Sequence, residues 1–308
     1  MYESLKAHSN DFHLFIFAFD DLSFQILKKL NLEKVTVISL SEFETPVLLE
    51  LKSKRTKAEY CWTCTPSVIS HILNNYSVSS CTYLDSDLIF YSDPSVLIQE
   101  MMDHNKNVLI TEHGFSPLAK LYEKKRAGRF CVQFVTFSNE SNSLRVLEKW
   151  RLQCIEWCYA RHENGKFGDQ KYLDEWPDIY DNVHILENPG GGIAPWNIPK
   201  YRFYRDDSEI AGKRKRSGLK FKVVFFHFQY VKLTENGNFD IGWYHISSEV
   251  KKIFYQPYLK RIRDMEKMLK ELDGNFKTGY TKFKADSIKS YFKIGLKKIT
   301  RYNIMKIN

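Results

Sequence analysis

An apolar strand pattern carries two carboxylates one residue apart in the segment Cys81-Thr82-Tyr83-Leu84-Asp85-Ser86-Asp87-Leu88-Ile89-Phe90. Side chains at positions i and i+2 of an extended chain point the same way, about 6.5 to 7 Å apart. Asp85 and Asp87 could therefore share a divalent cation, Mg²⁺ or Mn²⁺, which could in turn bind a diphosphate. The alternative is an ordinary loop start, because the turn-favouring run Tyr91-Ser92-Asp93-Pro94 follows.

Short β-rich apolar runs alternate with helical patterns over the first 200 or so residues. The pattern predicts strands at 13–19, 35–40, 81–90, 108–111, 132–137 and 183–186, and helices at 21–30, 66–75, 94–103, 143–161 and 169–176. Several strand runs are almost continuously apolar, as in strands that are buried on both faces. The sequence therefore predicts an α/β fold with a mostly parallel sheet flanked by helices. In such sheets ligands bind at the carboxyl ends of the strands, where Asp85 and Asp87 would lie.

The composition suits a globular protein: 308 residues, of which 43% are hydrophobic, can form one large α/β domain or a domain with an appendage. No apolar run approaches the roughly 20 residues that span a bilayer, and the N-terminus lacks the basic-then-apolar layout of a secretory signal. We therefore expect a cytoplasmic protein. The six cysteines are scattered through apolar segments, which predicts reduced core residues instead of a disulfide framework.

The positive charge is concentrated near the C-terminus. Residues 251–308 contain 16 Lys/Arg and 5 Asp/Glu, a net charge of +11, whereas residues 1–250 contain 30 and 32, a net charge of −2. We expect one domain over residues 1–244 and an amphipathic helical, basic tail over 245–308.

Two interpretations of this tail stay open. Its aromatic residues alternate with lysines and could rest on an anionic membrane surface, where each Lys or Arg contributes about 1 kcal/mol. The alternative is a solvated amphipathic helix, predicted at 245–272, followed by a frayed end. The aromatic residues concerned are Phe276, Tyr280, Phe283, Tyr291 and Phe292.

Two further segments supply polar groups. Asp169 and Gln170 open a predicted helix, and His227 ends the apolar run that begins at Val223. Taken alone, Asp169 would be an ordinary helix cap and His227 a buried core histidine. A neutral imidazole at His227 could instead complete the coordination of a metal held by the aspartates.

Together these segments resemble the GT-A-fold nucleotide-sugar transferases, specifically bacterial enzymes similar to glycosyltransferase family 8. The resemblance covers roughly residues 1–235, with the motifs in the family's order. It rests on Tyr83-Leu84-Asp85-Ser86-Asp87 as the DxD motif, on Phe167-Gly168-Asp169-Gln170-Lys171-Tyr172-Leu173 as the D-Q-x-x-L motif, and on Phe226-His227-Phe228-Gln229-Tyr230-Val231-Lys232 as the late His…Lys element.

The resemblance implies a GT-A (Rossmann-like) fold, a donor-binding role for each motif, and retention of the anomeric configuration. Asp85, Asp87 and His227 would bind Mn²⁺ or Mg²⁺, and the cation would bridge the diphosphate of the donor. Two other residues would act on the donor sugar: Asp169 would hold its hydroxyls and Gln170 would lie near its anomeric carbon.

Basic residues complete the implied donor site. Lys232 would neutralise the donor diphosphate, and Lys54 or Arg55, which precede the helical segment 59–75, would approach its phosphates. Glu112 and His113 follow the predicted strand 108–111 and are candidates for acceptor contacts.

The chain departs from the family pattern in three places. Phe130-Cys131-Val132-Gln133-Phe134 stands where the family has an Asn-containing segment with small residues, and Gln229-Tyr230-Val231 replaces a common glycine. The helix expected at Met1–Lys6 follows the first strand in the family, so 12–19 would match the second strand. We therefore expect either a start that lies upstream or a truncation with an incomplete donor pocket.

The expected partners are a nucleotide-sugar donor and a saccharide or lipid-linked acceptor of surface polysaccharide or lipopolysaccharide synthesis. The basic tail adds an anionic membrane surface, and with it a peripheral location on the inner face of the membrane; no nucleic acid is expected. Two alternatives remain open. A nucleic-acid-binding protein would use the tail but not the acidic motif. A metal-dependent phosphoesterase would use paired carboxylates, generally with more ligands than cluster near Asp85.

Overall fold

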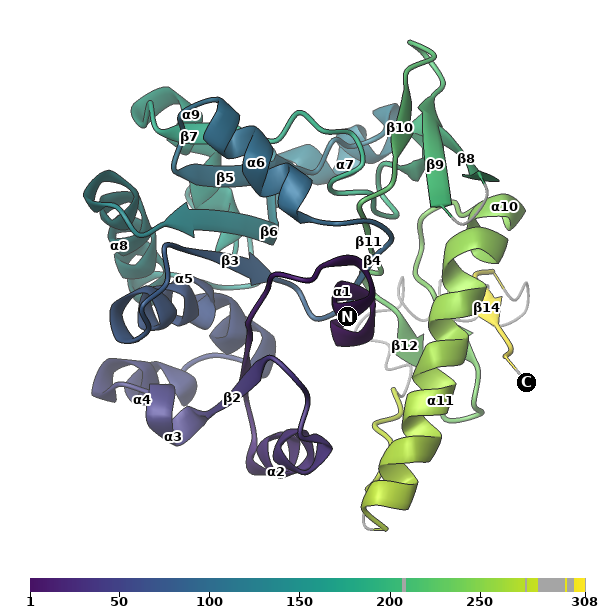
Figure 1. The fold of residues 1–308 in the computed structure, drawn as a ribbon, viewed down its shortest axis with the longest axis horizontal. Helices are drawn as coiled ribbons and strands as arrows, with labels where there is room; N and C mark the ends of the chain where they lie inside the picture. Colours follow the sequence, from purple (N-terminus) through teal and green to yellow (C-terminus); the bar gives the residue numbers. More distant parts are fainter. Residues whose placement is uncertain (207–208, 275, 282–296, 298–301, 308) are drawn as a thin grey trace.

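The computed structural model describes residues 1–206, 209–274, 276–281, 297 and 302–307, and the side chains of residues 122–126 are outside this description (Figure 1). Its strands are β1 (Leu14–Ala18), β2 (Val35–Ser39), β3 (Ser80–Leu84), β4 (Leu88–Phe90), β5 (Val108–Glu112), β6 (Phe130–Ser138), β7 (Val183–Ile185), β8 (Tyr201–Asp206), β9 (Glu209–Arg214), β10 (Lys220–Lys222), β11 (Phe225–His227), β12 (Lys232–Leu233), β13 (Phe239–Asp240) and β14 (Ile304–Met305). Its α-helices are α1 (Tyr2–His8), α2 (Asp21–Leu30), α3 (Leu40–Phe43), α4 (Pro46–Lys52), α5 (Lys57–Asn75), α6 (Ser95–Asp103), α7 (Pro117–Ala127), α8 (Ser141–Glu156), α9 (Trp176–Ile179), α10 (Ser248–Val250) and α11 (Gln256–Leu272). Three short helical turns are η1 (Gln170–Glu175), η2 (Ile198–Lys200) and η3 (Lys251–Tyr255). The α/β class predicted from the sequence is confirmed.

The largest sheet is mixed, which corrects the prediction of a mostly parallel sheet. Its strand order is β3-β6-β5-β7, and β6 runs antiparallel to both of its neighbours, whereas β5 and β7 are parallel. Nearly every residue of β6 is buried, and its sequence is mostly apolar, as in a parallel strand. An apolar run therefore indicates that a strand is buried on both faces, but it does not indicate the direction of the strand.

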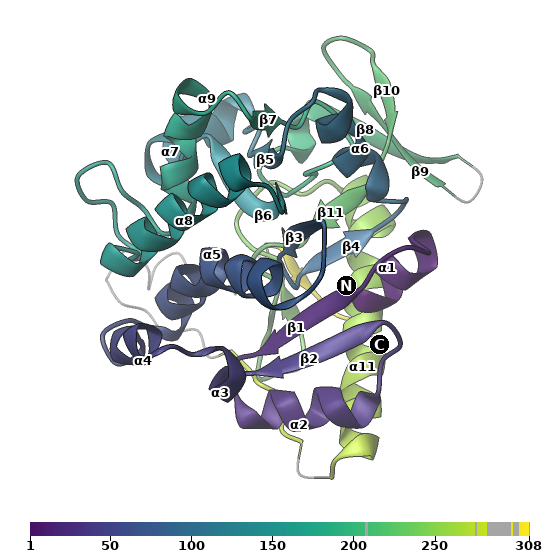
Figure 2. The same cartoon turned by 60° about the vertical axis from the view of Figure 1, so that its left-hand side comes forward.

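Strands β1 and β2 form a separate parallel pair below the main sheet in Figure 2, with α2 along the outer side of the pair. Among the described residues β1 pairs with β2 alone, and β3 pairs with β6 alone. Helix α5 packs against both β3 and α8. Its buried residues form one core with the apolar side chains of β5, β6 and α8, and this core supports the end of β3 where the candidate site begins.

The strand predicted at 81–90 is broken in two at the aspartates. Strand β3 ends at Leu84 and β4 begins at Leu88, with a turn at Ser86 and Asp87 between them. The two halves have different partners, because β3 pairs with β6 and β4 pairs with β11. Asp85 and Asp87 are therefore presented by a turn and not by one extended strand.

Helix α5 begins earlier than the helix predicted at 66–75. Thr56 and Glu59 form a capping box at its N-terminus, and Pro66 lies inside the helix. The helix predicted at 169–176 is present as the turn η1, which begins after Asp169 and is followed directly by α9, and the Asp169 side chain makes no capping hydrogen bond.

The helical stretch predicted at 245–272 is present as α10, η3 and α11, which lie on the opposite side of the molecule from α8 (Figure 1). Phe254 and Leu259 are fully buried and pack in the same core as Phe226 and Phe228. Of the tail aromatics, Phe283, Tyr291 and Phe292 lie outside the described residues.

Two expectations about composition can be compared with the structure. All six cysteines are free thiols, as predicted. None of the helices in the described part of the chain combines the length and the apolar character needed to cross a membrane.

Candidate functional site

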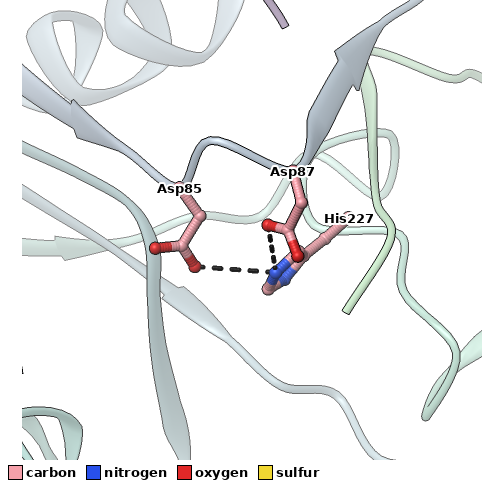
Figure 3. Close-up of side chains that lie close together, drawn as sticks. All are labelled: Asp85, Asp87 and His227. Atoms are coloured by element: carbon pink, nitrogen blue, oxygen red, sulfur yellow. Dashed lines mark ion pairs between the residues drawn. The ribbon is translucent and has the colours of Figure 1, made fainter. Parts of the chain in front are cut away.

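Three potential metal ligands converge where β3 gives way to β4 (Figure 3). The ligand atoms of Asp85, Asp87 and His227 all lie within 4.8 Å of one another. The imidazole Nε2 of His227 is 3.0 Å from Asp87 Oδ1 and 3.6 Å from Asp85 Oδ2. The structure thus brings together residues that are about 140 positions apart in the sequence.

Strand register places His227 beside the aspartates. Strands β4 and β11 are antiparallel with His227 opposite Leu88, so the imidazole lies next to the residue that precedes β4. Main-chain hydrogen bonds fix the backbone at Asp87 and at His227. The Phe228 amide donates to the Asp87 carbonyl at 2.9 Å, and the His227 amide donates to the Ile193 carbonyl at 2.8 Å. The cluster is therefore set by backbone pairing, and not by the side chains alone.

The three groups shift one another's protonation. Burial by itself lowers the pKa of His227, but the charge and hydrogen bond of Asp87, with further contributions from Cys131 and Asp85, raise it well above the usual range. Burial raises the pKa of Asp85, and the charge of His227 offsets part of this effect. Burial also acts to raise the pKa of Asp87, but the charge and the hydrogen bond of His227 outweigh this effect and lower the pKa.

The donor set fits a divalent cation of the Mn²⁺ class. Carboxylate oxygens suit Mg²⁺ and Mn²⁺, and the imidazole nitrogen favours a transition metal over Mg²⁺. The aspartate side chains are 31% and 37% exposed, whereas that of His227 is 6% exposed. A cation could therefore reach the carboxylates from the adjoining cavity and meet the imidazole as a fixed ligand.

The cavity that adjoins the cluster has a volume of about 2060 Å³ and is also lined by Asp169, Gln170, His113 and Trp196. Pockets for one small ligand usually measure about 300–1,000 Å³. This cavity therefore has room for two substrates side by side. It extends from the metal-ligand cluster between β1 and β3.

Asp169 is 6% exposed and is held at the cavity wall by its main chain. The indole Nε1 of Trp150 donates to the Asp169 carbonyl at 2.9 Å, and Gly168 before it adopts a φ of +53°, which favours glycine. Burial raises the pKa of the Asp169 carboxyl to about 7, with a further increase from Asp85 that is opposed by hydrogen bonding to Thr65. A carboxyl with this pKa can both donate and accept hydrogen bonds near neutral pH.

Gln170 also lines the cavity, and its Nε2 donates to the Ala127 carbonyl at 2.7 Å. Lys232 begins β12 and is outside the cavity wall, with its ammonium 4.4 Å from the ring centroid of Tyr230, which does line the cavity.

Lys54 and Arg55 do not line the cavity. Lys54 forms an ion pair with Glu50 on the surface of α4. Arg55 is buried and donates to the carbonyls of Cys154 at 2.7 Å and Ile155 at 2.6 Å, so it binds the C-terminal end of α8. Both side chains are therefore engaged away from the cavity that adjoins the cluster.

The two candidates for acceptor contacts have different surroundings. Glu112 forms an ion pair with Arg129 at 2.5 Å and does not line the cavity. His113 lines it, stacks on Phe115 with ring centroids 4.6 Å apart, and is almost fully buried. Burial lowers the pKa of His113 to about 4, so its imidazole is neutral near pH 7.

Sequence reasoning missed two residues that contact the cluster. The hydroxyl of Tyr83 donates to Asp85 Oδ1 at 3.0 Å, and Gln133 Oε1 lies 2.6 Å from His227 Nδ1. A signal for Gln133 was available, because it is a lone amide within the apolar run of β6.

Two proteins of Bacillus subtilis (strain 168) are similar to this chain in sequence. Uncharacterized protein YfnD is 31% identical over 268 residues, which cover 85% of this chain and 83% of YfnD. Uncharacterized protein YfnF is 30% identical over 236 residues, which cover 74% of this chain and 75% of YfnF. No family model matches the chain.

Comparison with solved structures gives weaker similarities. Mouse xyloside xylosyltransferase 1 in its apo form has a TM-score of 0.45 at 13% identity, covering 74% of this chain and 90% of its own. The glycosyltransferase GlyE of Streptococcus pneumoniae TIGR4 has a TM-score of 0.36 at 19% identity, covering 60% of this chain and 40% of its own. Scores this low support no conclusion about the fold or activity of this chain.

Proposed function

This chain belongs to the protein family of YfnD and YfnF, and we propose that it is a metal-dependent glycosyltransferase with a nucleotide-diphosphate sugar as donor. The observation that carries the proposal is the convergence of Asp85, Asp87 and His227 on one cavity that also contains Asp169 and Gln170. These are the residues of the three motifs that resemble the GT-A-fold enzymes, and they come from separate segments of the chain.

In this proposal Asp85, Asp87 and His227 hold Mn²⁺ or Mg²⁺ beside the donor diphosphate. A bound cation would stabilise the negative charge that develops on the departing diphosphate. Lys232 would add a second positive charge once Tyr230 gives access to it, since its ammonium now lies over that ring.

Asp169 and Gln170 would position the donor sugar. The Asp169 carboxyl has a pKa of about 7 and could donate or accept a hydrogen bond with a sugar hydroxyl. The anomeric carbon–oxygen bond breaks with its electron pair going to the diphosphate, and the acceptor hydroxyl oxygen forms the new bond. The proton of that hydroxyl leaves on a diphosphate oxygen. Beyond this, the protein needs only to orient the acceptor hydroxyl. We propose that the anomeric configuration is retained, on the basis of the resemblance to glycosyltransferase family 8.

For the acceptor we propose a saccharide or lipid-linked saccharide of surface polysaccharide or lipopolysaccharide synthesis. The cavity volume of about 2060 Å³ leaves room for it beside the donor. Aromatic faces suit the apolar faces of sugar rings, and both Phe115 and Trp196 line the cavity. The basic C-terminal residues would bring the enzyme to an anionic membrane on its cytoplasmic side.

The direct test is thermal unfolding of the chain against a panel of nucleotide sugars, with Mn²⁺ and with EDTA. A ligand present at 100 times its dissociation constant stabilises the native state by about 2.7 kcal/mol. We expect one donor to raise the melting temperature only when Mn²⁺ is present, and Asp87→Asn to abolish the increase. The matched control is Asp103→Asn, which changes an exposed aspartate of α6 and should leave the increase intact. A melting temperature that no donor alters would overturn the proposal.

The same protein and donors can distinguish sugar transfer to an acceptor from hydrolysis of the donor. A phosphoesterase would release nucleotide from the donor at the same rate with and without a saccharide acceptor. A transferase should release nucleoside diphosphate faster when the acceptor is added, and the new glycoside should appear in equal amount. Binding of RNA or DNA that weakens steeply with salt would instead favour the nucleic-acid alternative.

A further inference from the structure

Gln133 is a polar side chain in the most buried strand of the main sheet. It lies in the middle of β6 with no exposed surface, among residues that are almost all buried. Burying an amide costs free energy unless its polar atoms form hydrogen bonds. Its carbonyl oxygen Oε1 does so, 2.6 Å from Nδ1 of His227. The Gln133 amide is therefore a hydrogen-bond partner of the His227 imidazole.

This hydrogen bond determines which nitrogen of His227 is free. A neutral imidazole has one donor and one acceptor nitrogen, and an amide oxygen can only accept. The hydrogen of the neutral ring must therefore be on Nδ1, which leaves the lone pair on Nε2. Nε2 is the nitrogen that faces the carboxylates, 3.0 Å from Asp87 Oδ1. Only that tautomer can offer a ligand to a cation held by the aspartates.

Gln133 also contacts the other side of the cluster. Its main-chain carbonyl accepts a hydrogen bond from the Asp85 amide at 3.1 Å. One residue of β6 therefore holds the backbone of one metal ligand and the side chain of another. Its amide nitrogen, which has no hydrogen-bond partner among the described residues, lies against Gly192.

Gly192 provides the space for this amide. It adopts a φ of +97°, and a Cβ at this position would lie 3.1 Å from Gln133 Nε2. Any larger residue would therefore press on the side chain that orients His227. The glycine lets the amide stay in place against the imidazole.

We propose that Gln133 is a positioning residue that holds His227 in the tautomer able to bind a divalent cation. The inference rests on the proposed metal site and adds to it a residue that contacts neither the cation nor a substrate. Partners that orient a ligating histidine typically change metal affinity by about 10- to 100-fold when they are replaced.

The test measures Mn²⁺ binding in the absence of any nucleotide sugar, by titration calorimetry and by the EPR signal of free Mn²⁺. Gln133→Met keeps the approximate volume and removes the acceptor, and we expect Mn²⁺ affinity to fall about 10- to 100-fold. Gln133→Glu keeps an acceptor oxygen, and we expect affinity equal to or above that of the wild type. The matched control is Gln99→Met, which makes the same change at an exposed position of α6.

A second measurement identifies the tautomer effect itself. Pulsed EPR of Mn²⁺ bound to chain carrying ¹⁵N-labelled histidine should show nitrogen hyperfine coupling in the wild type and in Gln133→Glu. In Gln133→Met the coupling should be lost or much reduced, even where excess Mn²⁺ still occupies the carboxylates. Thermal unfolding checks that each variant is folded, and Gln133→Asn, which is too short to reach Nδ1, replaces the Met variant if that one does not fold.

The outcomes are distinguishable. A wild type that binds no Mn²⁺ overturns the proposed metal site, and the inference fails with it. A wild type that binds Mn²⁺, with a folded Gln133→Met that has the same affinity and the same hyperfine coupling, overturns the role of Gln133 and leaves the proposed function standing.

Discussion

Replacing Asp169 with asparagine should change how the stability of the fold depends on pH. In the native state burial raises the pKa of this carboxyl from 3.8 to about 7. In the unfolded chain it should titrate near the usual value of about 3.9. Between these two values the native state binds more protons at Asp169 than the unfolded state does. Stability contributed by this group therefore falls as pH rises from about 4 to about 7.

The size of the effect follows from the difference between the two pKa values. A rise of about 3 in pKa corresponds to about 4 kcal/mol, at 1.36 kcal/mol for each pKa unit. Asp169 is 6% exposed, so solvent screening reduces this value little. Because the side chain also lines a large cavity, about 4 kcal/mol is an upper limit. Asparagine has a similar shape and does not titrate. The free energy of unfolding of Asp169→Asn minus that of the wild type should therefore increase by up to about 4 kcal/mol between pH 4 and pH 8.

The assay is urea unfolding of both chains at several pH values, in EDTA so that no cation binds the neighbouring carboxylates. Asp178→Asn, which changes an exposed aspartate of α9, serves as the control and should show no such trend. A difference between Asp169→Asn and the wild type that stays constant from pH 4 to pH 8 would refute the reasoning, because it would mean that Asp169 titrates normally in the native state.

Three further outcomes are expected. Asp87→Ala, or Asp85→Ala, should abolish metal-dependent donor binding without unfolding the chain, and unchanged donor affinity in a folded variant would remove both residues from the proposed site. Gln170→Ala should keep donor binding but slow the transfer step, which single-turnover kinetics would detect; wild-type turnover would contradict its proposed position. Arg55→Met should lower the free energy of unfolding by about 3 kcal/mol, since hydrogen bonds to charged groups contribute about 1.5–3 kcal/mol each. Because Arg55 binds the carbonyl end of α8, its loss should leave donor affinity unchanged; a weaker donor affinity in the folded variant would place it in the donor site after all.

Much of the secondary structure could be predicted from local sequence. The helix predicted at 21–30 is α2, with Asp20 as its cap, and the strands predicted near 14, 35, 108 and 183 are all present. These elements have a regular spacing of apolar residues and clear end signals, which depend only on neighbours in the chain. The break at Asp85 and Asp87 was not predicted, because it depends on β3 and β4 having different partners.

The direction of the strands and the contacts of Arg55 could not be predicted from local sequence patterns either. Strand β6 is buried along almost its whole length and still runs antiparallel to β3 and β5, since burial constrains the side chains and not the direction of the backbone. Arg55 was expected near donor phosphates, but its distance from the C-terminal end of α8 could not be known before the helices were packed.

The order of residues specifies the functional groups that are available: two carboxylates at the end of an apolar strand, a histidine at the end of another, and an Asp-Gln pair after a glycine. Which of these groups lie close together depends on how the strands and helices pack. The antiparallel register of β4 and β11 places His227 beside Asp87, and β6 places the Gln133 amide against the imidazole. Residue identity specifies which hydrogen bonds and ligand bonds a side chain can form, but the distances on which those bonds depend arise from long-range strand pairing.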